Sequence, residues 1–361
     1  MKTFFTGFII ALFLSSQFLV ASEPVSGNEN STLKEHEKFD PSSFMFGHIS
    51  DAYDWHLLDI GKKSISIPLP VILFSKESGF HAFLSSKFEH GHATFKGFQI
   101  ANEGDHKGKI IETLADGSEE VPFDVSITKN IAALLFSIAL LLWMFLSVAK
   151  AYQRKPNHAP KGLQSWLEPV ILFVRDDIAK PSIGAKHYER FMPYLLTVFF
   201  FILINNLLGL IPIPPGGANV TGNIAVTMVL ALFTFVITTL RGSKSYWQHI
   251  FNTPGVPLWL KLPPMPIMPL VETIGVFTKP FILMVRLFAN ITAGHIIAMG
   301  FLSLIFIFKE MSEPLAYGVS VVSIGFIVFM SFLELLVAFI QAYVFTFLSA
   351  IYFGMAVEEH H

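Results

Sequence analysis

The chain has 361 residues, of which 52% are apolar and 14% aromatic, and its formal net charge is -2. This composition is typical of an integral membrane protein, and the absence of a basic tract argues against nucleic acid as a partner. Because the chain contains no cysteine, disulfides, thiol nucleophiles and thiolate metal sites are excluded.

Residues 1–22 have the pattern of a signal peptide. Lys2 precedes an apolar run over residues 4–20, and the small residues Ala21 and Ser22 follow it. This order is typical of a secretory signal with its cleavage site, and an uncleaved membrane anchor is the alternative. In either case, the polar residues 23–42 are expected outside the cytoplasm as a flexible lead.

Residues 23–125 predict an exported polar extension that is rich in β-structure. Between residues 44 and 123, short apolar clusters alternate with Gly and Pro, most clearly at residues 64–74 and 79–84, which favours short strands. More than half of the 13 histidines fall in this part of the chain, but their spacing matches no zinc pattern. We therefore expect surface histidines, no metal and no other cofactor.

Residues 126–361 predict a membrane domain of about five helices. The apolar runs cover residues 127–149, 191–213, 223–240, 267–308 and 315–355. Each run is close to or above the roughly 20 residues that span a bilayer. The last two runs are longer than an upright helix needs, so we expect them to be strongly tilted.

Basic residues predict the orientation of this domain. They gather between the first two runs and after the third, which the positive-inside rule assigns to the cytoplasm. The N-terminal extension and the C-terminus are then on opposite sides, with the C-terminus cytoplasmic. In the first basic loop, residues 163–178 alternate at helical spacing and include Trp166, which indicates a helix lying at the membrane surface.

Arg286 is the one fixed charge between Pro280 and Phe308. A mid-helix arginine costs about 3 kcal/mol on membrane-insertion scales. Arg286 could extend to the lipid headgroups, or it could face an interface where it meets a carboxylate. The second alternative would indicate an ion path, because ionisable groups inside membranes usually mark one.

Polar residues around Arg286 take defined faces at about 100° per residue. Asn290 shares the face of Arg286, whereas His295 is rotated by about half a turn. Glu272 lies about 40° from the Arg286 face if the helix continues through Pro280. Helical geometry therefore separates His295 from the arginine.

Glu334 and Gln341 form one polar stripe on the last run, two turns apart. Each of these polar groups also has a purely structural alternative. Asn290 and Gln341 could hydrogen-bond neighbouring helices, Glu272 could be an interfacial charge, and His295 with Glu334 could be a buried structural pair.

Three segments resemble the a subunit of F-type ATP synthase, the stator channel subunit beside the rotating c ring. They are residues 206–212 (NLLGLIP), residues 286–295 (RLFANITAGH) and the C-terminal residues 341–352 (QAYVFTFLSAIY) with 355–360 (MAVEEH). The resemblance extends from about residue 125 to the end. The N-terminal part lies outside the common family core and is similar to an extension found in some bacterial members.

The resemblance implies roles for individual residues. Arg286 takes the place of the family's essential arginine, Gln341 that of the glutamine facing it, and Asn290 that of the asparagine one turn on. Glu272 matches an acidic position on the cytoplasmic exit path.

His295 and Glu334 occupy two positions that form an acid and histidine pair across the family. Here the two residue types are exchanged relative to the best-known enteric members, as they are in mitochondrial ones. Gly209 stands where some members carry an aspartate, so the outer path is expected to rely on His295, Glu334 and Asn206.

As a whole, the resemblance implies an all-α polytopic membrane protein of a bacterial inner membrane, with its last two helices tilted against the c ring. The chain would be a non-catalytic subunit that conducts protons to and from the ring carboxylates. Its partners would be the c ring, the b subunits of the peripheral stalk, the lipid bilayer and, indirectly, the F1 sector. A stand-alone ion channel or transporter is the alternative, although the absence of an inverted repeat weakens a transporter. A non-conducting scaffold protein is a second alternative.

Overall fold

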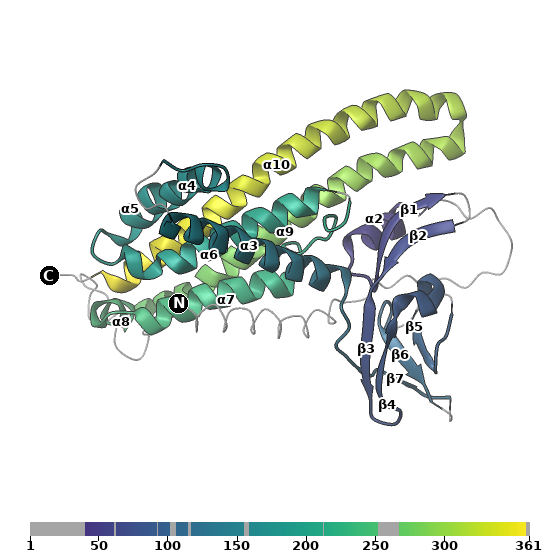
Figure 1. The fold of residues 1–361 in the computed structure, drawn as a ribbon, viewed down its shortest axis with the longest axis horizontal. Helices are drawn as coiled ribbons and strands as arrows, with labels where there is room; N and C mark the ends of the chain where they lie inside the picture. The colour runs from purple at the N-terminus through teal and green to yellow at the C-terminus, as the bar shows by residue number, and fades with distance from the viewer. Residues whose placement is uncertain are drawn as a thin grey trace.

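The computed structural model describes residues 40–60, 63–91, 93–101, 106–114, 117–154, 159–211, 213–251 and 267–358. The predicted signal peptide at residues 1–22 lies outside the described residues. The described chain consists of a β-rich N-terminal part and a long helical part that begins at α3 (Figure 1).

The N-terminal part contains three small antiparallel sheets, as the short apolar clusters predicted. The first pairs β1 (Asp54–Ile60) with β2 (Lys63–Pro68), the second has the order β4 (Gly79–Leu84), β3 (Pro70–Ser75), β8 (Phe123–Asp124), and the third has the order β5 (Phe98–Ile100), β6 (Ile110–Thr113), β7 (Glu119–Glu120). The 3-10 helix η2 (Ser85–Gly91) follows β4.

A small hydrophobic core holds this part together. Val71 and Leu73, which alternate with more exposed residues along β3, are fully buried, and they pack with Phe88, Phe98 and Ile110. Burying a side chain of this size contributes about 1.5–3 kcal/mol. The period-2 alternation that predicted a strand is therefore the pattern that builds the core.

One helix of the N-terminal part was not predicted. The sequence suggested a flexible lead up to residue 42 and strands from residue 44, but α2 (Pro41–Ile49) is a short helix. Asp40 accepts a hydrogen bond from the backbone N–H of Ser42 through Oδ1 at 3.0 Å, which satisfies one free N–H of the first turn. The short segment has no clear helical period, so the hydrophobic pattern could not reveal it.

Five helices among the described residues are long and apolar enough to cross a membrane, which confirms the predicted number. They are α3 (Lys129–Arg154), α6 (Tyr188–Leu210), α7 (Ile224–Arg241), α9 (Ile267–Met311) and α10 (Glu313–Val357). α7 begins at a capped N-terminus, because the side chain of Asn223 accepts a hydrogen bond from the N–H of Ala225 at 2.9 Å.

Shorter helices lie between these spans. α4 (Leu163–Phe173) continues through a π-helical turn, η3 (Val174–Ala179), into α5 (Lys180–Ile183), and confirms the helix predicted at residues 163–178. Trp166 is 83% exposed on it, as expected for an aromatic side chain at a membrane interface. α8 (Lys244–Phe251) was not predicted.

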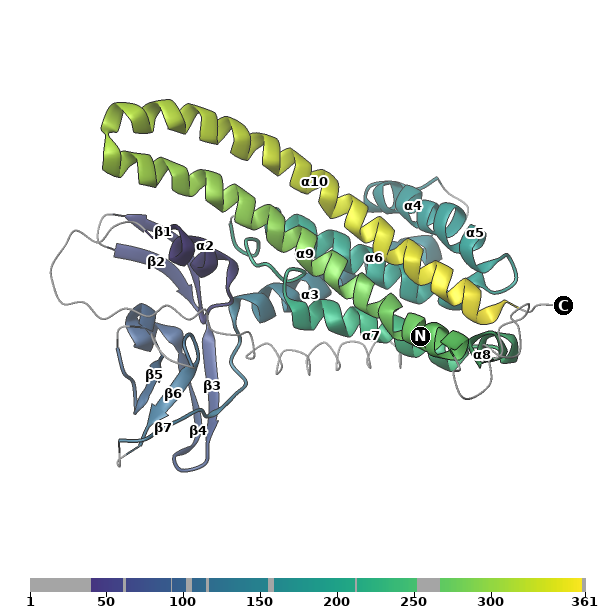
Figure 2. The same ribbon diagram turned by 180° about the vertical axis from the view of Figure 1, so that it is seen from behind.

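α9 and α10 form a long curved hairpin that is visible from both sides of the molecule (Figures 1 and 2). α9 continues through Pro280 without ending. Large apolar side chains are exposed along the hairpin, among them Phe281 (60%), Val321 (75%) and Phe332 (69%). Such a surface needs lipid or an apolar partner.

The C-terminal half of α10 is packed against α6 and α7. Phe199, Leu230 and Phe353, one from each helix, are fully buried in the shared core. Gly354 allows a close approach of α10 to α5, because a methyl group there would collide with the carbonyl oxygen of Ser182. This half of α10 is therefore held rigidly.

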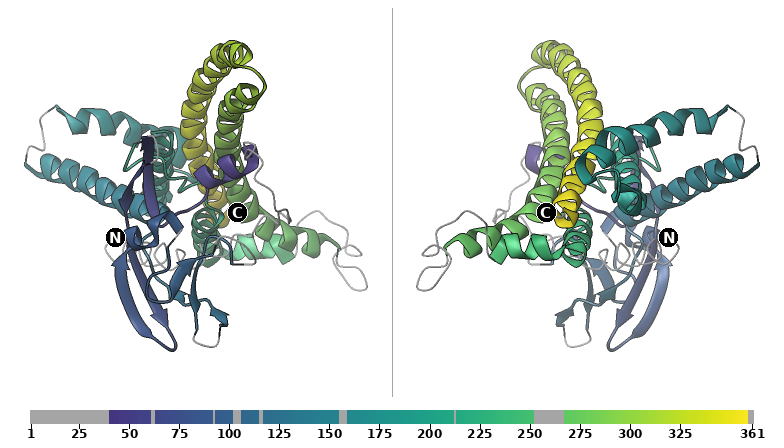
Figure 3. Two further views of the ribbon diagram at one scale, coloured as in Figure 1. Left: turned by 90° about the vertical axis from the view of Figure 1, so that its right-hand side faces the viewer. Right: turned by 90° about the vertical axis from the view of Figure 1, so that its left-hand side faces the viewer.

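The N-terminal part is joined directly to the helical part. Trp55 belongs to the same hydrophobic core as the membrane helices, and the rings of Phe44 in α2 and Phe306 in α9 lie 5.8 Å apart. The β-sheets and α2 lie toward one end of the helical part, whereas the last described residues of α10 lie at the other (Figures 1 and 2). Seen along the long axis, the α9–α10 hairpin projects to one side of the molecule and most of the β-strands to the other (Figure 3).

Candidate functional site

Arg286 and Asn290 lie together on an exposed face of α9. The neighbouring residues Leu283 and Leu287 are each only 1% exposed, so the packed surface of α9 ends close to the arginine. No described residue forms a hydrogen bond or ion pair with Arg286, although its charge acts on the phenol of Tyr352 in α10. Since a guanidinium at membrane depth needs an anionic partner, the exposed side of Arg286 is available to an anion from another chain.

His295 and Glu334 meet between α9 and α10. His295 Nδ1 lies 3.7 Å from Glu334 Oε1, and both side chains are largely buried, at 20% and 15% exposure. This distance is longer than a hydrogen bond, and Glu334 Oε1 has no hydrogen-bond partner among the described residues. A small shift or one bridging water would connect the pair.

Gly294 makes the approach of Glu334 possible. A methyl group added at this position would lie 2.7 Å from Glu334 Oε1 and 3.2 Å from its carboxyl carbon. The glycine beside His295 is therefore part of the geometry of the pair.

Asn206 connects α6 to α10 and to the loop that follows α6. Thr221 donates a hydrogen bond from Oγ1 to Asn206 Oδ1 at 2.6 Å, and Asn206 donates from Nδ2 to the carbonyl oxygen of Ala338 at 3.2 Å. Ala338 lies one turn beyond Glu334 on α10. Asn206 thus holds the polar pair against α6.

The loop between α6 and α7 folds back onto this region. Thr292 on α9 donates a hydrogen bond to the carbonyl oxygen of Gly222 at 3.4 Å. The side chain of Asn219 is 6% exposed, and neither of its polar atoms has a partner among the described residues. A Cβ at Gly209 would lie 3.8 Å from His295 Nε2, so a longer side chain there would stand beside the histidine.

Gln341 is buried at 4% exposure, two turns after Glu334 on α10. Ala338 and Ala342 beside it are also buried. The predicted polar stripe of α10 therefore faces the interior of the protein. The structure gives no hydrogen bond between Gln341 and Arg286, and their juxtaposition stays a prediction.

Glu272 lies toward the other end of α9 in a group that sequence reasoning did not assemble. Its charge acts on Lys279 and on Tyr246 of α8, and burial together with this carboxylate raises the pKa of Tyr246. Lys279 Nζ lies 5.6 Å from the ring centroid of Tyr352. Tyr246, Lys279 and Tyr352 also line a narrow cleft between α7, α8, α9 and α10.

The three groups follow one another along α9. At 1.5 Å per residue, Glu272 is about 21 Å before Arg286 and His295 about 14 Å after it. His295 is also turned away from the exposed face that carries Arg286. The arrangement gives two separate clusters of titratable side chains with an exposed arginine between them.

Residues 131–354 match the ATP synthase A chain family. This chain belongs to that family. The match covers residues 206–212, 286–295 and 341–352 and confirms the resemblance seen there. Residues 44–130 match a second family, which is described as a domain of unknown function.

Curated relatives support the assignment to the ATP synthase A chain family. ATP synthase subunit a of Chloroherpeton thalassium is 45% identical over 246 residues, which are 66% of this chain and 69% of the relative. ATP synthase subunit a 2 of Chlorobaculum tepidum is 48% identical over 67% of this chain and 66% of its own length. ATP synthase subunit a of Myxococcus xanthus is 42% identical over 79% of this chain and 88% of its own length.

All seven predicted site residues lie in the part that matches the ATP synthase A chain family. Sequence reasoning missed the polar residues Asn219 and Thr221, because an uncharged loop gives no signal of folding back. Lys279 could have been found, since it stands two turns before Arg286 on the same helix. Tyr246 and Tyr352 could not, because only the fold brings α8 and α10 to this end of α9.

Proposed function

We propose that this chain is the proton-conducting stator subunit of an ATP synthase F0 sector, not itself catalytic, and that it couples proton flow to ring rotation. The observation that carries the proposal is the exposed Arg286, which has no ion-pair partner among the described residues and lies between two separate titratable clusters. A partner that carries a carboxylate into the membrane would complete this site.

That partner is a ring of c subunits, each with one membrane carboxylate. Lipid favours the neutral, protonated form of a carboxyl group, whereas the positive charge of Arg286 favours the ionised form. A ring carboxylate that arrives at Arg286 therefore releases its proton. Asn290, exposed one turn away, is placed to hydrogen-bond the same carboxylate.

His295, Glu334 and Asn206 provide the outer path. Histidine exchanges protons near neutral pH, and the short gap between His295 and Glu334 allows a proton to pass between them through one water. Asn206 fixes α6 against α10 beside the pair. Gln341 is the polar group that follows on the same face of α10.

Glu272, with Lys279 and Tyr246, provides the inner path. A proton released at Arg286 leaves along this cluster toward the cytoplasm. The fixed charge of Arg286 bars a direct passage between the two paths, because a second cation is repelled there. Each proton that crosses a potential of about 100 mV supplies about 2.3 kcal/mol.

The chain also has fixed partners. The exposed apolar hairpin of α9 and α10 supports contact with the ring and the bilayer, while the b subunits hold the stator and link it to the F1 sector. Basic loops orient the chain with its N-terminal part in the periplasm and its C-terminus in the cytoplasm of a bacterial inner membrane.

The test is ATP-driven acidification of inverted membrane vesicles that carry Arg286→Ala. We expect pumping to be lost while the complex stays assembled. Passive proton leak, measured after the peripheral ATPase is removed, reports whether the arginine separates the two paths. Arg190→Ala, at an exposed arginine near the start of α6, is the matched control and should pump normally.

Normal pumping by Arg286→Ala would refute the proposal. The rival reading, a self-contained channel or transporter, predicts conductance from the purified chain alone. A stator subunit should be inert in that assay because it lacks the ring carboxylates.

A further inference from the structure

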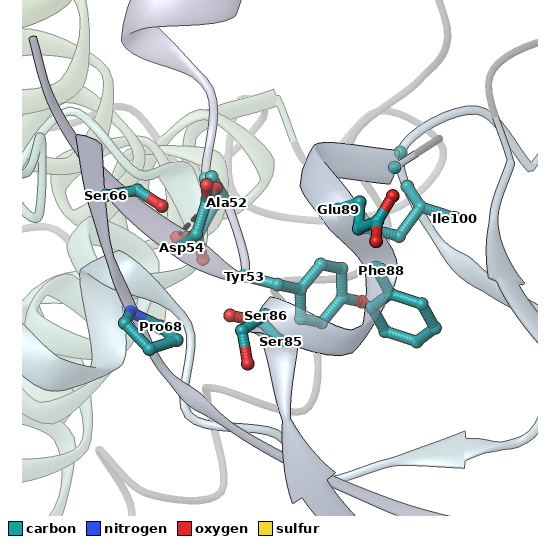
Figure 4. A pocket seen from close by; sticks show the side chains of 13 residues that line it. Ala52, Tyr53, Asp54, Ser66, Pro68, Ser85, Ser86, Phe88, Glu89 and Ile100 are labelled. Carbon is teal, nitrogen blue, oxygen red and sulfur yellow. Dashed lines mark hydrogen bonds between the residues drawn. The ribbon is translucent and has the colours of Figure 1, made fainter. Parts of the chain in front are cut away.

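The N-terminal part contains a partly open cavity of about 590 Å³ that the proposed function does not use. The carboxylates of Asp51, Asp54 and Glu89 line it, and its described lining residues include no Lys, Arg or His. Figure 4 shows Asp54 and Ser66 on one side, Glu89 on the other and the ring of Tyr53 between them. A hollow lined by one sign of charge concentrates the opposite charge.

The wall of this cavity is bonded to the start of the first membrane helix. The N–H of Lys129 donates to the carbonyl oxygen of Ala52 at 2.9 Å, and the N–H of Asn130 donates to Asp51 Oδ1 at 3.0 Å. Lys129 is 8% exposed and Asn130 is 4% exposed. Lys129 and Asn130 therefore form a buried contact between the wall of the cavity and the membrane domain. We call this contact the joint.

Lys129 is an unusual residue for this position. A cation in the first turn opposes the helix dipole, and enclosing an ammonium is costly unless other charges compensate. The charges of Asp51 and Asp54 act on Lys129, and the charge of Lys129 acts in turn on His295. The charge of Lys129 is thus felt both at the carboxylates of the cavity wall and at His295.

A buried oxygen without a partner lies at the start of α3, and another lies at the His295–Glu334 pair. Asn130 Oδ1 and Glu334 Oε1 are enclosed and have no hydrogen-bond donor among the described residues. Nearly all buried polar atoms in proteins are hydrogen-bonded, and ordered water supplies the bond where the chain does not. We therefore expect an ordered water molecule both at the joint at α3 and beside the His295–Glu334 pair.

α2 fixes the N-terminal part on the outer half of α9. The Sδ atom of Met45 lies 3.9 Å from a Cβ built at Gly300. Gly300 is five residues beyond His295, about 7.5 Å along the helix. α2, and with it the N-terminal part, is therefore docked on α9 within two turns of His295.

We propose that this cavity is the outer vestibule of the proton path, in which Asp54 and Glu89 concentrate protons and water at the Asn130 joint passes them to His295 and Glu334. A carboxylate takes a proton from an external hydronium ion, gives it to the next water and returns to its ionised form. Lys129 is a positioning residue at the joint, where the carboxylates of Asp51 and Asp54 offset its charge. In this it differs from Arg286, which has no ion-pair partner among the described residues. This inference rests on the proposed function.

The test uses the purified whole complex in liposomes, oriented so that the N-terminal part faces the lumen. ATP synthesis is driven by an acid–base step at low and at high lumenal salt. The double variant Asp54→Asn with Glu89→Gln should be about 3- to 10-fold slower at low salt, and the difference should shrink at high salt because ions screen the carboxylates. Asp54→Glu keeps the charge and should retain the rate.

Glu77→Gln is the matched control, because Glu77 is an exposed carboxylate at the β3–β4 turn that does not line the cavity. Its rate should equal that of the unchanged complex. Asn130→Leu tests the joint at nearly constant size. If Asn130 Oδ1 holds no water, leucine should be accepted with little effect on the rate, because no hydrogen bond to that oxygen is lost. If it holds a water of the proton path, Asn130→Leu should slow synthesis several-fold at every salt concentration with assembly intact.

Normal rates in both the double variant and Asn130→Leu would overturn the vestibule. Equal slowing of the double variant at low and high salt would also overturn it, since that result indicates damage to the fold. Arg286→Ala in the same liposomes separates the two proposals. If it blocks synthesis while the vestibule variants are normal, the vestibule alone fails, and if it is silent, the proposed function fails.

Discussion

Arg286 and His295 illustrate how one helix can present polar groups to two different sides. The two residues are nine positions apart, so α9 turns them to different sides. Arg286 is exposed, while His295 is largely buried against Glu334. The separation follows from helical geometry alone, and for this reason the sequence predicted it correctly.

The His295–Glu334 pair can be tested by exchange. We expect the double variant His295→Glu with Glu334→His to retain more ATP synthesis than either single change, because a 3.7 Å contact can be rebuilt with its members reversed. The singles leave a histidine facing a histidine or a carboxylate facing a carboxylate, and should lose on the order of tenfold or more in rate. The measurement is respiration-driven ATP synthesis in inverted vesicles.

The prediction is decided by comparing the rate of ATP synthesis of the double variant with the rates of the two single variants. If the two residues act independently, their effects add and the double variant is slower than either single. A double variant no faster than the singles would therefore contradict direct pairing. The amounts of assembled complex must be equal in all variants, which immunodetection of the membranes provides as the control.

The sequence predicted those parts of the candidate site that depend on the helical spacing of residues within one helix. It did not predict the parts that depend on contacts between distant segments of the chain. The shared face of Arg286 and Asn290 followed from spacing. Thr221, which bonds Asn206, was hidden in a loop without charge. The group of Lys279, Tyr246 and Tyr352 required knowledge of the packing of three helices, which no local pattern carries.

At the scale of elements, the crossing of α9 and α10 depends on Gly294. We expect Gly294→Ala to reduce proton-driven ATP synthesis by about tenfold, because a methyl group 2.7 Å from Glu334 Oε1 displaces the carboxylate and small misplacements in a relay are costly. The measurement is the same vesicle assay, with ring and stator assembly checked in parallel.

Gly275→Ala is the control for this change. Gly275 is also on α9, but a Cβ there would meet nothing within 4 Å. Alanine should therefore be accepted in the helix, with a small gain from its better helix propensity. Equal losses in the two variants would assign the effect to α9 in general and would contradict a specific role for the glycine at the crossing.

The elements themselves were largely predictable because long apolar runs dominate this chain. All five spans and the surface helix at α4 were found, and α9 runs through Pro280 as a membrane helix can. The two misses, α2 and α8, are short helices of 9 and 8 residues. α2 has no clear period of its own. α8 buries Tyr246 and Ile250, which are one turn apart, but eight residues are too few for such a pattern to predict a helix.

At the scale of the molecule, the N-terminal part is docked on two membrane helices at once. Backbone hydrogen bonds join it to α3, and α2 packs against α9. In a rotary machine, a part held on the stator can stay rigid throughout the cycle, whereas a contact with the ring must break at every step. The docking of α2 therefore predicts a fixed contact.

This contact can be measured by cross-linking, because the chain contains no cysteine of its own. The pair Met45→Cys with Gly300→Cys places thiols where Met45 Sδ now lies 3.9 Å from a Cβ built at Gly300. We expect a short bis-maleimide to link the pair within one chain in the assembled complex and to leave ATP synthesis within about twofold of its rate before linking, since neither position has to move. Met45→Cys with Gly275→Cys, toward the opposite end of α9, should not link. Efficient linking that stops synthesis would mean that α2 must leave α9 during turnover, and the N-terminal part would then act as a moving gate instead of a fixed wall of the outer path.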